Sequence, residues 1–147
     1  MRPIGHVRTP HSRHSDVPKG RGAKHVAEGE IVVYPEFEQG LTDIEGMSHL
    51  FIIWGFSEAD GFSLMAHPPS DDRPHGVFAT RSPRRPNPIG LTVVELLKRE
   101  GNVLHVRGVD MLDGTPVLDI KPYLSSIPAE KLSRGWLDEA EAREEDI

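Results

Sequence analysis

The chain has 147 residues, 37% of them hydrophobic, which is typical of one globular domain. It has no cysteine, which excludes disulfide frameworks and thiolate zinc sites, and its 13 prolines and 14 glycines favour short strands over long helices. The net charge of −6 argues against a nonspecific nucleic-acid binder, because such binding needs clustered cations. An RNA partner must therefore meet a local basic patch.

Charge is distributed unevenly along the chain. Residues 1–30 hold six Lys/Arg against three Asp/Glu, whereas residues 128–147 hold three against seven. No apolar run reaches membrane-spanning length, and the N-terminus, MRPIGHVRTP, lacks the apolar core of a signal peptide. We therefore expect a cytoplasmic protein that is not associated with a membrane.

Seven short apolar runs are typical of strands and lie at residues 4–9, 30–35, 49–56, 76–80, 91–97, 102–109 and 116–123. They predict an all-β fold, either a barrel or a sandwich. The run HLFIIWGF at 49–56 is apolar at nearly every position, which predicts a strand buried on both faces. By contrast, VLHVRGV alternates as a half-buried strand does.

Turn and helix signals separate these runs. EGN at 100–102 and DGT at 113–115 are typical of hairpin turns, so residues 91–123 are predicted to form an antiparallel meander. GLTDIEGM at 40–47 favours a short helix or a turn. After Pro128 the pattern favours a helix interrupted at Gly135 and anchored by Leu132 and Trp136. We expect a β-domain over residues 1–127 and an acidic helical tail over 128–147.

The segment RSPRRPNPIGL, beginning at Arg81, is the most unusual stretch of the chain. Its three prolines fix φ and restrict the residues before them, which excludes both a helix and a regular strand. The segment is predicted to be a rigid loop on which Arg81, Arg84 and Arg85 are preorganised for a carboxylate or a phosphate. Alternatively, it is a proline-stiffened connection whose arginines only keep it soluble.

A second constellation, VDMLDGTPVLDIKPY, carries the carboxylates of Asp110, Asp113 and Asp119. They are suited to accept hydrogen bonds from an amine, a ribose or an adenine amino group. The spacing of a calcium loop is absent. Alternatively, Asp113 serves only the turn, and Asp119 pairs with Lys121 or an arginine.

The remaining signals are weaker or negative. HSRH at 11–14 has no third ligand at a defined spacing, so we expect no metal site, and His49 at the start of an apolar strand favours a structural role over a site role. No GxGxxG, GxxxxGK[ST] or GxSxG motif is present, which leaves the usual dinucleotide, nucleotide-triphosphate and serine-hydrolase sites without support.

The residues also carry a family resemblance. The phrases PIGHVRTP, GLTDIEGMSHLFIIW, GVFATRSPRRPNPIGLTVVELL and GVDMLDGTPVLDIKPY, in that order, resemble the TsaA-like, or TrmO (YaeB), family of tRNA methyltransferases. The resemblance implies a small antiparallel β-barrel outside the Rossmann class, a homodimer, and S-adenosyl-L-methionine as cofactor. It also implies tRNA as the substrate, with N6-methylation of N6-threonylcarbamoyladenosine beside the anticodon.

The family motifs also imply site residues. Those implied to bind the cofactor are Gly20, Arg21, Gly22, Ser57, Glu58, Arg81, Leu91, Asp110, Met111, Leu112 and Asp113. The match at 20–22 departs from the family, whose members often have a glutamine in this loop. The acidic residues would face the positive sulfonium and accept hydrogen bonds from the amino groups, Arg81 would bind the carboxylate, and the apolar residues would hold the adenine.

Several functional hypotheses follow from these residues. The leading one is an S-adenosylmethionine-dependent tRNA methyltransferase in which Arg84 and Arg85 meet RNA phosphates. The catalytic residues are unknown; the candidates for a base are Asp110, Asp113 and His49. The alternatives are a methyltransferase with another substrate and a noncatalytic module that binds S-adenosylmethionine or RNA.

Overall fold

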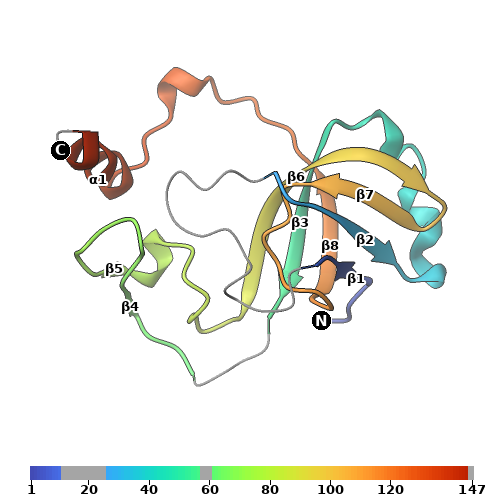
Figure 1. Cartoon of the computed structure of the whole chain (residues 1–147), viewed down its shortest axis with the longest axis horizontal. Helices are drawn as coiled ribbons and strands as arrows, with labels where there is room; N and C mark the ends of the chain where they lie inside the picture. Colours follow the sequence, from blue (N-terminus) through green and yellow to red (C-terminus); the bar gives the residue numbers. More distant parts are fainter. Residues whose placement is uncertain (11–25, 57–60, 146–147) are drawn as a thin grey trace.

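Six strands close into an antiparallel barrel (Figure 1). The structure, a computed structural model, describes residues 1–10, 26–56 and 61–145. The barrel order is β1-β2-β7-β6-β3-β8, with the strands β1 (Gly5–Arg8), β2 (Glu28–Val33), β3 (His49–Gly55), β6 (Ile89–Glu100), β7 (Val103–Arg107) and β8 (Pro116–Pro122). This closed sheet confirms the prediction of a small all-β barrel.

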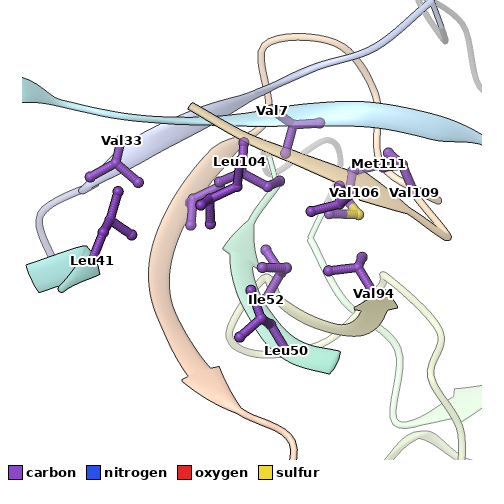
Figure 2. Packing of buried hydrophobic residues seen from close by; sticks show 12 residues of the cluster. Val7, Val33, Leu41, Leu50, Ile52, Val94, Leu104, Val106, Val109 and Met111 are labelled. Atoms are coloured by element: carbon purple, nitrogen blue, oxygen red, sulfur yellow. The ribbon is translucent and has the colours of Figure 1, made fainter. Parts of the chain in front are cut away.

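The core lies inside the barrel, where apolar side chains from the strands meet (Figure 2). Along β7 the burial alternates as predicted, with Leu104 and Val106 fully buried and their neighbours half-buried. Each strand presents one apolar face inward, and closure leaves no free sheet edge. The buried cluster consists of Val7, Ile31, Val33, Leu41, Leu50, Ile52, Val94, Leu104, Val106, Val109, Met111 and Val117.

Short elements lie outside the barrel. They are the 3-10 helices η2 (Pro35–Leu41), η3 (Ile44–Gly46), η4 (Val77–Ala79) and η5 (Ala129–Lys131), the strands β4 (Met65–Ala66) and β5 (His75–Gly76), and the helix α1 (Trp136–Glu145). The short helix predicted near residues 40–47 is thus present as η2 and η3. We call residues 61–80, which contain β4, β5 and η4, the lobe. In Figure 1 the lobe and α1 lie together on one side of the barrel.

The predicted strand at 76–80 is wrong. Only Gly76 is in a strand, paired with Met65, and the next three residues form η4. Thr80 closes this turn twice, because its backbone N–H and its hydroxyl both donate to the carbonyl of Val77, at 3.1 and 3.0 Å. A side chain that competes for a nearby carbonyl in this way favours a turn over a sheet ladder.

The predicted meander over 91–123 is correct only in its first half. β6 and β7 pair through the turn at residues 100–102, but β8 pairs with β1 and β3 instead of β7. The DGT sequence lies on a crossing segment: the Gly114 N–H donates to the carbonyl of Val7 at 2.7 Å. Gly114 has a φ of 85°, a conformation that glycine adopts without strain. Closing the barrel therefore takes precedence over the local hairpin signal.

Two further expectations need correction. β3 is not buried on both faces: Leu50 and Ile52 are buried, whereas Phe51 and Ile53 are half-buried on the outer face. At the C-terminus, α1 begins directly after Gly135, as predicted, but Leu132 is 60% exposed and anchors nothing. Of the two predicted anchors only Trp136 contacts the rest of the fold, and its contacts are described below.

Candidate functional site

The loops that carry the predicted site leave one end of the barrel. Strand register places the end of β1 and the start of β2 beside the end of β7, and the start of β6 beside the end of β3. Because β6 and β7 are antiparallel, the start of β6 and the end of β7 also lie at the same end. Segments distant in sequence are therefore brought to the same end of the barrel.

The loop at residues 81–88, which we call the arginine loop, enters β6 at this end. Its shape is held by Arg85, whose Nη1 donates to the carbonyls of Thr80 and Ser82 at 2.9 and 3.0 Å. The Thr80 hydroxyl also accepts the backbone N–H of Ser82 at 3.2 Å. Prolines and these hydrogen bonds together give the rigid, irregular loop that the sequence predicts.

The other two arginines of this loop point outward. Arg81 and Arg84 are exposed, and their guanidinium groups make no hydrogen bond or ion pair with any residue that the structure describes. Since the loop backbone is already fixed, little backbone entropy is lost when these groups bind an anion. Arg85 therefore stabilises the loop itself, whereas Arg81 and Arg84 do not.

A second loop, residues 108–114, follows β7, and we call it the acidic loop. Asp110 in this loop is fixed to the barrel by a chain of two hydrogen bonds. The Trp54 indole N–H donates to the hydroxyl of Thr92 at 3.0 Å, and that hydroxyl donates to Oδ1 of Asp110 at 2.6 Å. Thr92 is only 5% exposed, so the chain is largely protected from water. The other Asp110 oxygen has no partner among the described residues.

Gly90 allows this arrangement. A Cβ atom at this position would overlap the six-membered ring of Trp54, so the indole lies directly against the backbone of β6. The Phe56 ring packs against the same indole, with ring centroids 5.3 Å apart. The glycine that follows the arginine loop thus provides the close approach by which Trp54 reaches Thr92.

Asp113 lies at the other side of the acidic loop, where its Oδ1 accepts the Thr9 N–H at 3.0 Å. A cavity of about 490 Å³ opens beside it between β1, β2 and β7. Arg8 lines the cavity and bonds Glu30 at 2.7 Å; this contact raises the pKa of Arg8 and lowers that of Glu30. The cavity lining also includes His105 and Leu97.

The three apolar residues implied to bind the cofactor differ in exposure. Met111 is 1% exposed and packs in the barrel core, so its side chain is not available to a ligand at the loop surface. Leu91 precedes the buried Thr92 on β6, and its exposed side chain points away from the barrel interior. Leu112 is half-buried, and its carbonyl accepts two hydrogen bonds from Thr115.

His49 lies elsewhere. It begins β3, whereas Trp54 is near the end of that strand, so His49 is at the opposite end of the barrel from Asp110. Its Nδ1 is 2.9 Å from the Ser48 hydroxyl, and its ring packs edge-on to Tyr123. A second cavity, of about 690 Å³, lies at this far end; Asp119 is in its lining, but none of the residues implied to bind the cofactor is.

Five predicted positions, Gly20, Arg21, Gly22, Ser57 and Glu58, lie outside the described residues, as does HSRH at 11–14. Over the described ranges, no group of three or more His, Asp or Glu is placed to hold a metal ion. Within the same ranges, no helix has the length and apolar character needed to cross a membrane. Asp119 pairs with Lys121 at 3.4 Å, in agreement with its structural interpretation.

Within one chain, the two loops meet only indirectly. Among the described residues, no hydrogen bond or ion pair joins the arginine loop to the acidic loop. Thr92, on the strand that follows the arginine loop, holds Asp110 of the acidic loop. Leu91 and Thr92 point to opposite faces of β6. The described part of a single chain therefore does not close a pocket around Arg81, Leu91 and Asp110 together.

Sequence reasoning missed Trp54 and Thr92. The sequence signals for them were a threonine inside an apolar strand and a tryptophan near the end of another apolar strand. It also missed Phe78, which is 78% exposed three residues before Arg81. An aromatic ring this exposed beside unpaired arginines is typical of surfaces that contact nucleic acid.

The geometry defines a class of protein: a small antiparallel barrel whose loops present a fixed carboxylate and unpaired guanidinium groups at one end. Comparison with known proteins makes the family specific. Residues 6–129 match the model of the tRNA-methyltransferase O N-terminal domain, and the chain belongs to this family.

Relatives and solved structures agree with that membership. A protein of Archaeoglobus fulgidus described as a probable S-adenosyl-L-methionine-binding protein is 51% identical over 142 residues, which cover 95% of this chain and 38% of the relative. A Mus musculus tRNA (adenine(37)-N6)-methyltransferase is 47% identical over 91 residues, covering 60% of this chain and 21% of its own length. The barrel superposes on a crystal structure of TrmO with a TM-score of 0.73 and 34% identity, over 89% of this chain and 61% of that one.

The chain thus spans less than two thirds of the length of each of these three proteins.

Proposed function

We propose that the protein is an S-adenosylmethionine-dependent methyltransferase that acts in the cytoplasm on tRNA, where it methylates N6 of N6-threonylcarbamoyladenosine. The observation that carries the proposal is the fixed carboxylate of Asp110, placed at the barrel end from which the arginine loop departs. The descriptions of relatives as an S-adenosyl-L-methionine-binding protein and as a tRNA adenine methyltransferase support the cofactor and the substrate class.

The chemistry of the described residues fits the cofactor. A sulfonium and an ammonium group favour carboxylate neighbours, and Asp110 has an oxygen available for them. The cofactor carboxylate favours a guanidinium, and Arg81 is unpaired among the described residues. When bound, S-adenosylmethionine supplies the methyl group.

The residues of the chain would act mainly by positioning. Fixing two reactants in line is worth roughly 7 to 11 kcal/mol in favourable cases. Methylation of an N–H group also releases a proton, and we propose Asp110 or Asp113 as the acceptor. The relay from Trp54 through Thr92 fixes one oxygen of Asp110, so the other keeps a defined direction. His49, at the opposite barrel end, has no part in this proposal.

We propose a homodimer as the working unit. Leu91, Val93 and Leu97 point outward from β6 and are 36 to 42% exposed, and the segment after β8 exposes Leu124 and Ile127 even more. Apolar surface of this kind is typical of a subunit interface. A second subunit on this face would also supply the cover that Leu91 lacks in one chain.

The dimer is tested by light scattering after size-exclusion chromatography. The wild type is expected at twice the chain mass of 16.3 kDa, and Leu124→Asp with Ile127→Asp at the monomer mass with weaker cofactor binding. A monomeric wild type that binds cofactor normally contradicts this part of the proposal.

The proposed function is tested by calorimetry with S-adenosylmethionine, followed by incubation with threonylcarbamoylated tRNA and methyl-labelled cofactor. We expect binding to the wild type, at least tenfold weaker binding to Arg81→Ala, and label in the modified adenosine. Absence of binding to the folded protein rejects the methyltransferase. Binding without transfer to this or another RNA favours a noncatalytic module.

The RNA surface is proposed to include Arg84 and Phe78, with Arg84 meeting phosphate and Phe78 stacking on an unpaired base. Arg84→Ala is expected to weaken tRNA binding and to reduce the slope of log affinity against log salt by about one. Because Arg85 holds the arginine loop, Arg85→Ala is expected to weaken cofactor binding as well. An unchanged salt slope in Arg84→Ala rejects the phosphate contact.

A further inference from the structure

Helix α1 docks on the lobe through one buried carboxylate. The Asp71 side chain is 2% exposed, and it accepts His75 Nε2 at 2.8 Å, the Asp72 N–H at 2.8 Å and Arg143 Nη2 at 2.7 Å. Arg143 lies near the end of α1, whereas the other partners belong to the lobe. A buried carboxylate with partners on both sides therefore ties the two segments together.

The start of α1 makes a different pair of contacts. The Trp136 indole stacks on the His75 imidazole, with ring centroids 4.1 Å apart and planes inclined by 16°. Its N–H donates to the carbonyl of Ala79 at 2.8 Å. Between the two ends, Ala140 is 3% exposed, so the middle of α1 is also covered.

The carbonyl that Trp136 binds is next to the motif proposed to hold the cofactor. Ala79 ends η4 and is followed by Thr80 and Arg81. The other hydrogen bonds of residues 77–85 with described residues have partners in the lobe or in the loop itself. They include Thr80 to Val77, Arg85 to Thr80 and Ser82, Ser63 to Arg84, and Val77 to Leu64. Among the described residues, Trp136 is the hydrogen-bond partner that reaches this stretch from outside.

We infer that α1 is a clamp that positions Arg81, with Trp136 as the positioning residue. This inference rests on the proposed function, because Arg81 is there assigned to the cofactor carboxylate. The family match ends at residue 129, before α1 begins, so the clamp lies outside the part of the chain that the family describes. Release of Trp136 frees the Ala79 carbonyl and lets the backbone before Arg81 move.

The first test follows the loop directly and needs no cofactor. Amide hydrogen exchange is measured for Thr80 and Ser82 in the full chain. We expect Trp136→Phe, which keeps a ring on His75 but loses the N–H, to speed exchange about threefold to tenfold, and Trp136→Ala to speed it more. The control is Arg134→Ala, because Arg134 pairs with Asp138 and Glu141 of its own segment and, among the described residues, makes no hydrogen bond or ion pair with the lobe.

The second test asks whether Trp136 acts through Arg81. S-adenosylmethionine affinity is measured for Trp136→Phe, for Arg81→Ala and for the double variant. We expect Trp136→Phe to weaken binding about threefold to tenfold in the wild type and to have no further effect in the Arg81→Ala background. A residue that only stabilises the fold would lower affinity by the same factor in both backgrounds.

The outcomes separate the clamp from the proposed function. Unchanged exchange at Thr80 and Ser82 in Trp136→Ala, with the barrel amide of Leu96 also unchanged, overturns the clamp. Equal effects of Trp136→Phe in both backgrounds overturn its action through Arg81. If the wild type binds no S-adenosylmethionine, the proposed function and the positioning role both fail, while the exchange result still decides whether α1 holds the loop.

Discussion

The buried cluster inside the barrel consists of 12 apolar residues, with Thr92 as a buried polar residue on β6, whereas the contact between the lobe and α1 is built around a buried carboxylate, an imidazole–indole stack and arginines. Figure 1 shows these two regions side by side in the fold. The barrel is stabilised by removal of apolar surface from water, which does not depend on protonation. The lobe contact depends on charges, so it is expected to open without the barrel unfolding.

The largest expected effect is in the barrel. Leu50→Ala removes a fully buried side chain of β3 and is expected to lower the free energy of unfolding by roughly 2 to 5 kcal/mol. The measurement is urea denaturation followed by circular dichroism. The matched control is Leu132→Ala, outside the barrel at 60% exposure, where the loss is expected to be clearly smaller. Equal losses at both positions contradict this assignment of the core.

A smaller effect is expected where the barrel meets the acidic loop. Thr92→Val keeps the shape of the side chain but leaves the Trp54 N–H without an acceptor and Asp110 without a donor. The expected loss is about 1 to 3 kcal/mol, with weaker S-adenosylmethionine binding, measured by denaturation and calorimetry. Thr42→Val is the control, because its hydroxyl bonds only the exposed carbonyl of Gln39. Normal cofactor binding by a folded Thr92→Val protein argues against a role for the relay.

Disruption of the lobe contact should be local. Asp71→Ala removes the acceptor shared by His75 and Arg143, so amides of α1 are expected to exchange about tenfold faster or more. The urea midpoint of the barrel is expected to stay the same. Asp72→Ala changes the neighbouring exposed carboxylate and serves as the control. A barrel midpoint that falls together with α1 protection contradicts the separation of the two regions.

The smallest expected effect is a pH response confined to α1. The pKa of Asp71 is held well below its ordinary value of 3.8, mainly by the hydrogen bond from His75. The Asp72 and Arg143 contacts lower this pKa as well. Arg73 lies 3.7 Å away as a further cation. A depressed folded pKa contributes docking free energy that is complete above pH 3.8 and is lost as pH falls through the folded value.

Trp136 fluorescence in a Trp54→Phe background measures this response, since the chain has two tryptophans. We expect α1 to remain docked at pH 4 and to release below it, and Asp71→Asn to lack this acid transition. Release of α1 with a midpoint above pH 4 contradicts the assignment of the transition to Asp71.

The barrel strands were predictable because alternate residues of a strand point to the same face of the sheet, so alternating apolar residues indicate a strand with one buried face. Six of the seven predicted strands are present, and β7 alternates as its sequence indicates. The turn that replaces the predicted strand at 76–80 was not predictable, because it depends on the Thr80 hydroxyl, whose hydrogen bond the apolar pattern does not reveal. The pairing of β8 was also hidden, since closure with β1 depends on strands more than a hundred residues apart.

The candidate site shows the same division. The prolines predicted a rigid arginine loop, and the structure has one, but only the fold distinguishes Arg85, which bonds two carbonyls, from Arg81 and Arg84, which bond none of the described residues. Family motifs pointed to Met111, whose side chain proves to be part of the core. No sequence motif indicates the hydrogen bonds from Trp54 through Thr92 to Asp110, because a threonine in an apolar strand is common.

By itself, the sequence determined the fold class, the stiffness of the arginine loop and the family, because apolar period, proline chemistry and motif order are local properties of the chain. Only the tertiary structure decided which end of the barrel carries the site, which arginines are available, and that α1 returns to the carbonyl of Ala79. These contacts join residues tens of positions apart, and their partners are selected by barrel closure and helix docking rather than by any neighbouring residue.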